Sequence, residues 1–169
     1  MIEIYRAGWQ LTKVRGVMIM ALACAIGGCW WGWDLFQTYG LRPADGGTLA
    51  PLGTRLALGL FLALLGIAFA AGMWIYGKLY AGAIRFDEAA DMLHVHTIEY
   101  IFGGRDIAFP PSAIDAADWH EGQSDFGRGV SVDAPWFSLR IAGRRLPLIL
   151  DAQGLFPDRV LAARLLRLA

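Results

Sequence analysis

Two long runs without a charged residue dominate the first half of the chain. They extend over residues 16–33 and 56–77. As α-helices, which rise 1.5 Å per residue, they would measure roughly 27 and 33 Å, close to the bilayer hydrocarbon core of about 30 Å. The pattern predicts a helical hairpin in a membrane. Its parts are an N-terminal segment 1–15, a first transmembrane helix 16–35, a loop 36–54 and a second transmembrane helix 55–80.

Beyond Tyr80 the apolar positions change from a helical spacing to alternation, which is typical of strands. The run from Met92 is the longest and is rich in β-branched and aromatic residues. Strands are predicted at 83–86, 92–102, 105–109, 136–141 and 145–150, and residues 113–120 are expected to form a further strand or a short irregular edge segment. Turns are predicted at 87–91, at Gly103-Gly104 and at 142–144, with a flexible polar loop at 121–128.

The chain ends in a predicted amphipathic helix, 158–169, with Leu161, Leu165 and Leu168 on one stripe. Strand hairpins followed by one covering helix make a small α+β domain, which we expect at 81–169. Its element order is similar to that of a pleckstrin-homology-like half-barrel. The predicted fold class is therefore membrane α+β: a two-helix transmembrane hairpin followed by a small β-rich domain with a C-terminal amphipathic helix.

Basic residues flank the two predicted spans on one side. Arg6 and Lys13 precede the first span and Lys78 follows the second, whereas loop 36–54 contains Arg42 as its single basic residue. Because Lys and Arg near spans stay on the cytoplasmic or matrix side, we expect both termini on that side. The expected location is the cytoplasmic (inner) membrane of a bacterium, or the mitochondrial inner membrane.

Small residues recur at the same spacing in both spans. They are Ala21, Ala25, Gly28 and Gly32 in the first, and Gly59, Ala63, Gly66 and Ala70 in the second. This spacing places four small residues on one stripe of each helix. Since close backbone approach drives helix association in lipid, we expect the two stripes to pack against each other. The alternative is that one stripe faces a partner protein.

Composition and charge narrow the class of function. The formal net charge is zero, so the molecule has no global attraction for nucleic acid, and none is expected as a partner. Neither span has an Asp, Glu, His, Lys or Arg in its interior, which argues against a transporter or channel. No catalytic, phosphate-cradling or metal-ligand motif is present. We therefore expect a protein that is not an enzyme and that uses no cofactor.

Three histidines are the weak candidates for a metal site. His94 and His96 alternate on a predicted strand and so share a face. Together with His120 they would supply three imidazole ligands. The alternative is an ordinary solvent-facing or interface-facing strand surface, and no metal is expected.

Basic residues of the C-terminal domain are candidates for contact with lipid or a partner. They are Arg128, Arg140, Arg144 and Arg145. Alternation places Arg140 and Arg144 on one face of the predicted hairpin. Near an anionic membrane, each basic residue adds about 1 kcal/mol of attraction. The alternative is a solvated hairpin tip.

The segment that ends at Pro157 has residues suited to turns. Gly143 permits a tight hairpin turn, Leu148 and Leu150 are expected in the core, and Asp151 is suited to cap the next turn. Gly154 is expected at a positive φ. The segment is thus interpreted first as maintaining the fold.

The same segment resembles a known family. Gly143-Arg144-Arg145, an apolar strand ending at Leu150-Asp151, then Gly154 and Phe156-Pro157 are similar to the end of the transmembrane protein 223 group. That group belongs with the related groups 70 and 186. A hairpin followed by a β-rich domain matches its layout.

The resemblance implies an inner-membrane assembly factor linked to the biogenesis of cytochrome c oxidase, with no catalytic residues. Its implied partners are membrane lipids and other membrane subunits of a respiratory complex. Two other functions stay open. One is an accessory subunit of a respiratory or photosynthetic complex, and the other is a membrane-anchored module that senses lipid headgroups.

Overall fold

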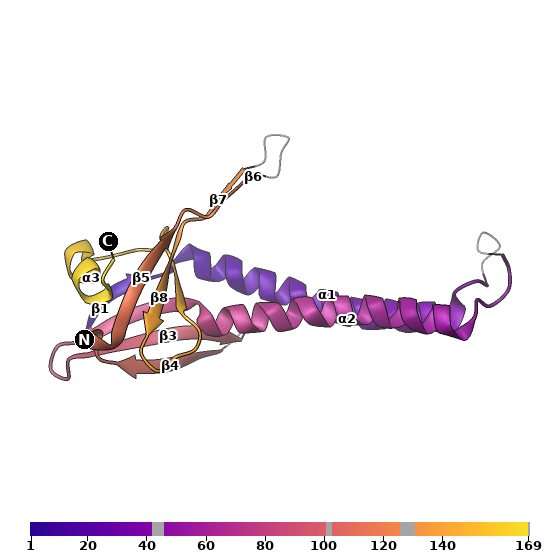
Figure 1. Cartoon of the computed structure of the whole chain (residues 1–169), viewed down its shortest axis with the longest axis horizontal. Helices are drawn as coiled ribbons and strands as arrows, with labels where there is room; N and C mark the ends of the chain where they lie inside the picture. Colours follow the sequence, from indigo (N-terminus) through magenta and orange to yellow (C-terminus); the bar gives the residue numbers. More distant parts are fainter. Residues whose placement is uncertain (42–45, 101–102, 126–130, 169) are drawn as a thin grey trace. The chain divides into compact units, whose positions relative to one another are not determined.

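The computed structural model describes residues 1–41, 46–100, 103–125 and 131–168 (Figure 1). The chain divides into two compact units. One unit contains residues 16–75, and the other contains residues 1–15 together with 76–169.

The unit 16–75 is a pair of apolar helices. It contains most of α1 (Trp9–Thr38) and most of α2 (Leu52–Leu79). Both helices are long and apolar enough to cross a membrane. Their large side chains are exposed, and the Trp30 side chain is 74% accessible. Because water would strongly disfavour so much exposed apolar surface, the helices belong in lipid, and the chain is a membrane protein.

Glycines lie where α1 and α2 meet. A Cβ atom added to Gly59 would lie 2.6 Å from the carbonyl oxygen of Gly32, and one added to Gly28 would lie 2.8 Å from that of Leu62. A Cβ on Gly66 would lie 2.5 Å from the carbonyl oxygen of Cys24. All three distances are shorter than real Cβ contacts. The two backbones therefore approach each other more closely than any side chain at these positions would allow.

The unit of residues 1–15 and 76–169, called the soluble unit below, contains two larger antiparallel sheets and one two-stranded sheet. The first has the order β1-β2-β3-β4, and the second has the order β5-β8-β9. The strands of the first are β1 (Ile2–Arg6), β2 (Ala81–Asp87), β3 (Met92–Tyr100) and β4 (Gly103–Phe109). Those of the second are β5 (Ile114–His120), β8 (Trp136–Ile141) and β9 (Leu148–Asp151). A separate hairpin joins β6 (Gln123–Asp125) to β7 (Ser131–Asp133), and η2 (Pro111–Ala113) links the two sheets along the chain.

Strand β1 was not expected from the sequence, although it completes the first sheet. It pairs antiparallel with β2, with a register shift between Glu3 and Tyr5. Such a bulge turns two successive side chains toward the same side. This explains why Ile4 and Tyr5 are both fully buried, and why the segment lacks the strict alternation that marks a strand in a sequence.

Two of the expected turns are different in the structure. Gly103 and Gly104 belong to β4, where Gly103 pairs with Tyr100. Gly104 leaves room for the His96 ring, which would overlap a Cβ atom at this position. The expected loop 121–128 contains strand β6. In both places glycine and short polar residues were interpreted as turn formers, whereas pairing with a neighbouring strand decides the local structure.

The last helix, α3 (Arg159–Leu166), lies beside β1 (Figure 1). Asp158 caps it, since its Oδ1 accepts a hydrogen bond of 2.8 Å from the Leu161 amide. The buried residues are Ala162 and Leu166. The expected stripe of Leu161, Leu165 and Leu168 is only partly buried, because the helix turns the neighbouring Ala162 and Leu166 most directly to the core.

Tyr5 connects the start of the chain with its end. The Asp151 amide donates a 3.0 Å hydrogen bond to the Tyr5 hydroxyl oxygen, and the Tyr5 and Phe156 rings lie 5.0 Å apart. Burial raises the pKa of Tyr5 above its ordinary value of 10.0, so the phenol stays protonated. The neighbouring Asp151 Oδ1 accepts a 2.8 Å hydrogen bond from the Gln153 amide, which is the expected cap.

Gly154 does not have the expected positive φ. Glycine is required there for space, because a Cβ atom would lie 2.5 Å from the Tyr5 ring. The expectations for the rest of this segment are confirmed: Gly143 has a φ of 80°, and Leu148 and Leu150 are fully buried.

We expect Gly154→Ala to destabilise the soluble unit by about 1–3 kcal/mol, as is typical when an atom is forced into a packed core. Gly103→Ala is the matched control, since a Cβ atom there meets nothing within 4 Å. Urea unfolding of the full chain in detergent, followed by tryptophan fluorescence, measures both. Equal stability of the two variants would contradict the packing of Tyr5 on Gly154.

We expect Gly32→Ile to separate the two apolar helices, because its Cβ atom would overlap the backbone carbonyl of Gly59. Gly27→Ile is the control on the same helix, because a Cβ atom there meets nothing within 4 Å. The temperature at which the purified chain aggregates in mild detergent should fall for Gly32→Ile alone. A similar fall for both variants would mean that the glycine contact does not hold the hairpin.

Candidate functional site

The residues that follow the apolar part of α2 lie within the soluble unit. Two cavities are lined by residues from this short segment. Lys78 lines a basic cavity together with Thr97, Arg105, Ile107 and Arg144. Tyr76 and Tyr80 line a larger cavity with residues from β8, β9 and the chain around Pro135.

The basic cavity has a volume of about 100 Å³ and is built on the paired strands β3 and β4. Thr97 and Arg105 are register partners, so their side chains leave the sheet on the same face. The buried Thr97 hydroxyl donates a 3.2 Å hydrogen bond to the Arg105 carbonyl. Ile107, two residues further along β4, lines the same cavity.

Arg144 reaches this cavity from the turn between β8 and β9. Gly143 adopts a φ of 80° there, and the Arg144 amide donates a 3.0 Å hydrogen bond to the Ile141 carbonyl. Burial, followed by the positive charge of Arg105, lowers the pKa of Arg144. The turn therefore holds one guanidinium against another in a partly desolvated position, which favours an anion between them.

The described residues that line this cavity include three cations and no carboxylate. Arg140 provides the contrast. Its guanidinium lies 3.2 Å from Asp118 Oδ2 across strands β5 and β8, and both side chains are exposed. Arg140 thus has a counter-charge on its neighbouring strand, whereas no described ion pair neutralises Arg105 or Arg144.

The larger cavity, of about 450 Å³, is lined by three aromatic residues, Tyr76, Tyr80 and Trp136, by one acidic residue, Asp151, and by small or apolar residues. The Tyr76 and Tyr80 rings lie 5.6 Å apart, and the Tyr80 hydroxyl donates a 3.4 Å hydrogen bond to Asp151 Oδ2. Tyr80 also forms a parallel bridge with Ile149. These contacts join the end of α2 to strand β9.

The three expected contact residues that the structure describes have different surroundings. Arg144 lines the basic cavity, whereas Arg140 is paired with Asp118 and Arg145 is exposed. Arg128 lies outside the described residues. The expected shared face of Arg140 and Arg144 is absent, because Arg144 lies in a turn rather than on a strand.

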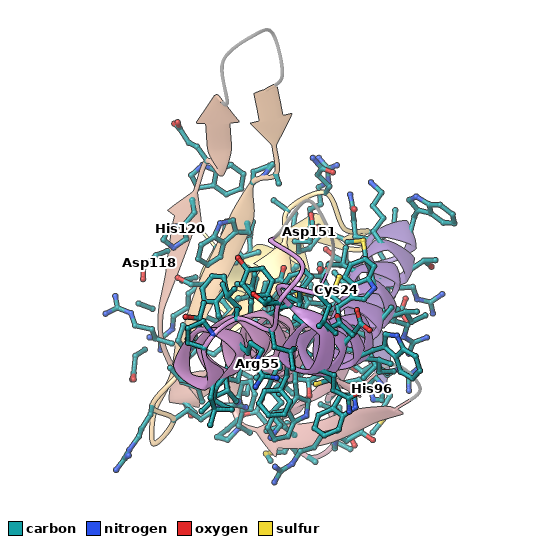
Figure 2. The ribbon with its side chains drawn as sticks, turned by 90° about the vertical axis from the view of Figure 1, so that its right-hand side faces the viewer. Cys24, Arg55, His96, Asp118, His120 and Asp151 are labelled. Carbon is teal, nitrogen blue, oxygen red and sulfur yellow. The ribbon has the colours of Figure 1, made fainter. Side chains whose placement is uncertain are left out.

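The structure does not bring the three histidines together. His94 and His96 lie on β3, where the His96 Nδ1 atom is 2.8 Å from Asp106 Oδ1. His120 is in the other sheet, stacked on Trp136 with ring centroids 3.9 Å apart. Figure 2 shows His96 and His120 on opposite sides of the view. Within the described ranges no cluster of three metal-ligating side chains occurs.

Sequence reasoning missed Lys78, Thr97 and Arg105 as members of one cavity. Of the three, Lys78 alone has a position that the sequence marks, since it directly follows the second apolar run. The strand register that joins Thr97 to Arg105, and the turn that brings in Arg144, follow from pairing between distant segments. No local pattern reports such pairing.

Comparison with known proteins gives one match. A model of the TMEM70/TMEM186/TMEM223 protein family matches residues 11–167. The match begins in α1 and ends just after α3, so it includes both apolar helices and most of the soluble unit. Neither the curated proteins nor the solved structures contain a match.

We expect Arg105→Gln and Arg140→Gln to change stability in opposite directions. Arg105→Gln removes repulsion with Arg144 and should stabilise the chain by up to about 1 kcal/mol, whereas Arg140→Gln loses its contact with Asp118 and should destabilise it by a similar amount at most. Both effects should shrink in high salt. Urea unfolding at low and high ionic strength measures them, and destabilisation by Arg105→Gln would refute the repulsion.

Proposed function

The chain belongs to the TMEM70/TMEM186/TMEM223 protein family, and from this membership we propose that it is an assembly factor for a respiratory complex in the inner membrane. A general role in assembling a membrane complex follows from the family. The single observation that carries the proposal is the extent of the match, since residues 11–167 include the membrane hairpin and the domain together.

We propose cytochrome c oxidase as the client complex, on the basis of the resemblance of the segment from Gly143 to Pro157 to the transmembrane protein 223 group. The proposed location is the bacterial cytoplasmic membrane or the mitochondrial inner membrane. Both termini are proposed to lie on the cytoplasmic or matrix side, because the basic residues Lys13 and Lys78 flank the hairpin there.

The hairpin is the part proposed to hold an immature subunit. Its helices contact each other through glycines and leave large apolar side chains exposed, among them Trp31, Phe61 and Leu64. An apolar groove of about 660 Å³ lies along it, lined by small residues such as Gly27 beside large ones such as Trp31. In a bilayer this surface packs against lipid or another helix.

The soluble domain is proposed to be pleckstrin-homology-like and to contact soluble factors without catalysing a reaction. Its order of a four-stranded sheet, a three-stranded sheet and a final helix supports this comparison. The membrane hairpin then takes the place of the connection between the first two strands.

A pull-down of the tagged chain from membranes in mild detergent, with quantitative mass spectrometry, tests the function. We expect immature oxidase subunits, or factors that insert haem or copper, in less than equal amounts with the bait. The Gly32→Ile variant should lose them, since its hairpin is disrupted. An equally expressed, unrelated two-span membrane protein provides the control.

Other outcomes separate the alternatives. Equal amounts of a complete complex would make the chain an accessory subunit. Immature subunits of a different complex would keep the assembly role and reject cytochrome c oxidase as the client. Recovery of no membrane subunit above the control would reject both the assembly and the subunit functions.

A further inference from the structure

We propose that the basic cavity formed by Lys78, Arg105 and Arg144 binds one phosphate group, supplied by the headgroup of an anionic phospholipid. The guanidinium groups of Arg105 and Arg144 hold the phosphate oxygens, and the Lys78 ammonium, from the last turn of α2, adds a third positive charge. Thr97 and Ile107 also line the cavity.

The size of the cavity fits a phosphate group. A water molecule in the liquid takes about 30 Å³, so a cavity of about 100 Å³ has room for a group equivalent to roughly three waters. A phosphate group has this size, whereas a nucleotide base with its sugar is several times larger. The Thr97 hydroxyl already donates to a backbone carbonyl, so the donors proposed for the phosphate oxygens are the guanidinium groups of Arg105 and Arg144.

The chemistry of the two arginines also fits phosphate. Guanidinium groups present N–H donors in a planar fork that matches two phosphate oxygens. Arg105 comes from strand β4 and Arg144 from the turn between β8 and β9, both line one cavity, and no described ion pair neutralises either of them. Like charges that share a partly desolvated cavity repel each other, and a bound anion converts this repulsion into attraction.

The position of Lys78 in the chain identifies the lipid as the source. Lys78 follows directly after the apolar run that ends at Gly77, so it lies at the level of the headgroups when α2 spans the bilayer. Anionic headgroups are concentrated at this level. Free phosphate has the same chemistry, and the experiment below separates the two sources.

The inference does not depend on the identity of the client complex. A phosphate bound at this point would join β4, the turn after β8 and the end of α2, and would fix the domain to the membrane surface. The pull-down described above and the lipid experiment below have separate readouts, so either can fail without the other.

The test uses the full chain purified in dodecyl maltoside. Native mass spectrometry measures the retention of dioleoyl phosphatidylglycerol against dioleoyl phosphatidylcholine from an equimolar mixture. The wild type should retain phosphatidylglycerol preferentially. Arg105→Gln and Arg144→Gln should each weaken this retention roughly tenfold, the effect of losing one charge-assisted contact. Arg144→Lys, which keeps the charge without the planar fork, should lose part of it.

Arg145→Gln is the matched control, because Arg145 is the exposed neighbour of Arg144 and lies outside the cavity lining. It should retain lipid as the wild type does. Arg105 lies on an exposed strand position, so Arg105→Gln keeps the test valid even if Arg144→Gln fails to fold. Unchanged retention in Arg105→Gln, or an equal loss in Arg145→Gln, overturns the proposal.

A second arm titrates the chain with inorganic phosphate against chloride at equal ionic strength and follows the melting temperature. Stabilisation that disappears in Arg105→Gln, together with displacement of phosphatidylglycerol, supports the phosphate site and makes free phosphate a competing source. Lipid retention without any effect of inorganic phosphate supports the headgroup alone. Absence of both effects in the wild type overturns the site.

Discussion

The pairing of β1 with β2 is the constraint on which the rest of the molecule depends. β1 precedes the first apolar helix and β2 follows the second, yet the two strands are neighbours in one sheet. Both ends of the hairpin must therefore lie on the same side of the membrane. The chain between β1 and β2 is long, so bringing these strands together has an entropic cost. This cost is lower when α1 and α2 pack against each other and order the intervening chain.

The segment around Asp151, Gly154 and Leu155 also holds β1 in place. Tyr5 on β1 accepts a hydrogen bond from the Asp151 amide, and its ring fills the space left free by Gly154. Arg6 and Leu155 add mutual backbone hydrogen bonds of 2.9 and 2.7 Å. The residues that resemble the family thus hold the start of the chain in the sheet, which gives them a structural role.

Charged residues are absent from the two apolar runs and are unevenly paired in the soluble unit. The two apolar runs contain no charged residue, while Lys78 directly follows the second. In the soluble unit Arg140 has its partner Asp118, whereas Arg105 and Arg144 share a cavity that has no carboxylate among its described lining residues. Lys78, Arg105 and Arg144 therefore bring three positive charges to one cavity, and Lys78 directly follows the second apolar run.

The sequence by itself determined the two long apolar helices, the strand Trp136–Ile141 and the turn at Gly143, because each depends on a contiguous pattern. An apolar run long enough to cross a bilayer can be recognised without any knowledge of the fold.

Only the tertiary structure decided that Ile2–Arg6 is a strand, that Gly103 and Gly104 lie within β4, and that Ala162 rather than Leu161 faces the core. The tertiary structure also placed Arg105 and Arg144 in the lining of one cavity, while Arg140 contacts Asp118 instead. The physical reason is the same in each case: strand register and helix rotation are set by contacts between residues far apart in the chain, and no local periodicity contains that information.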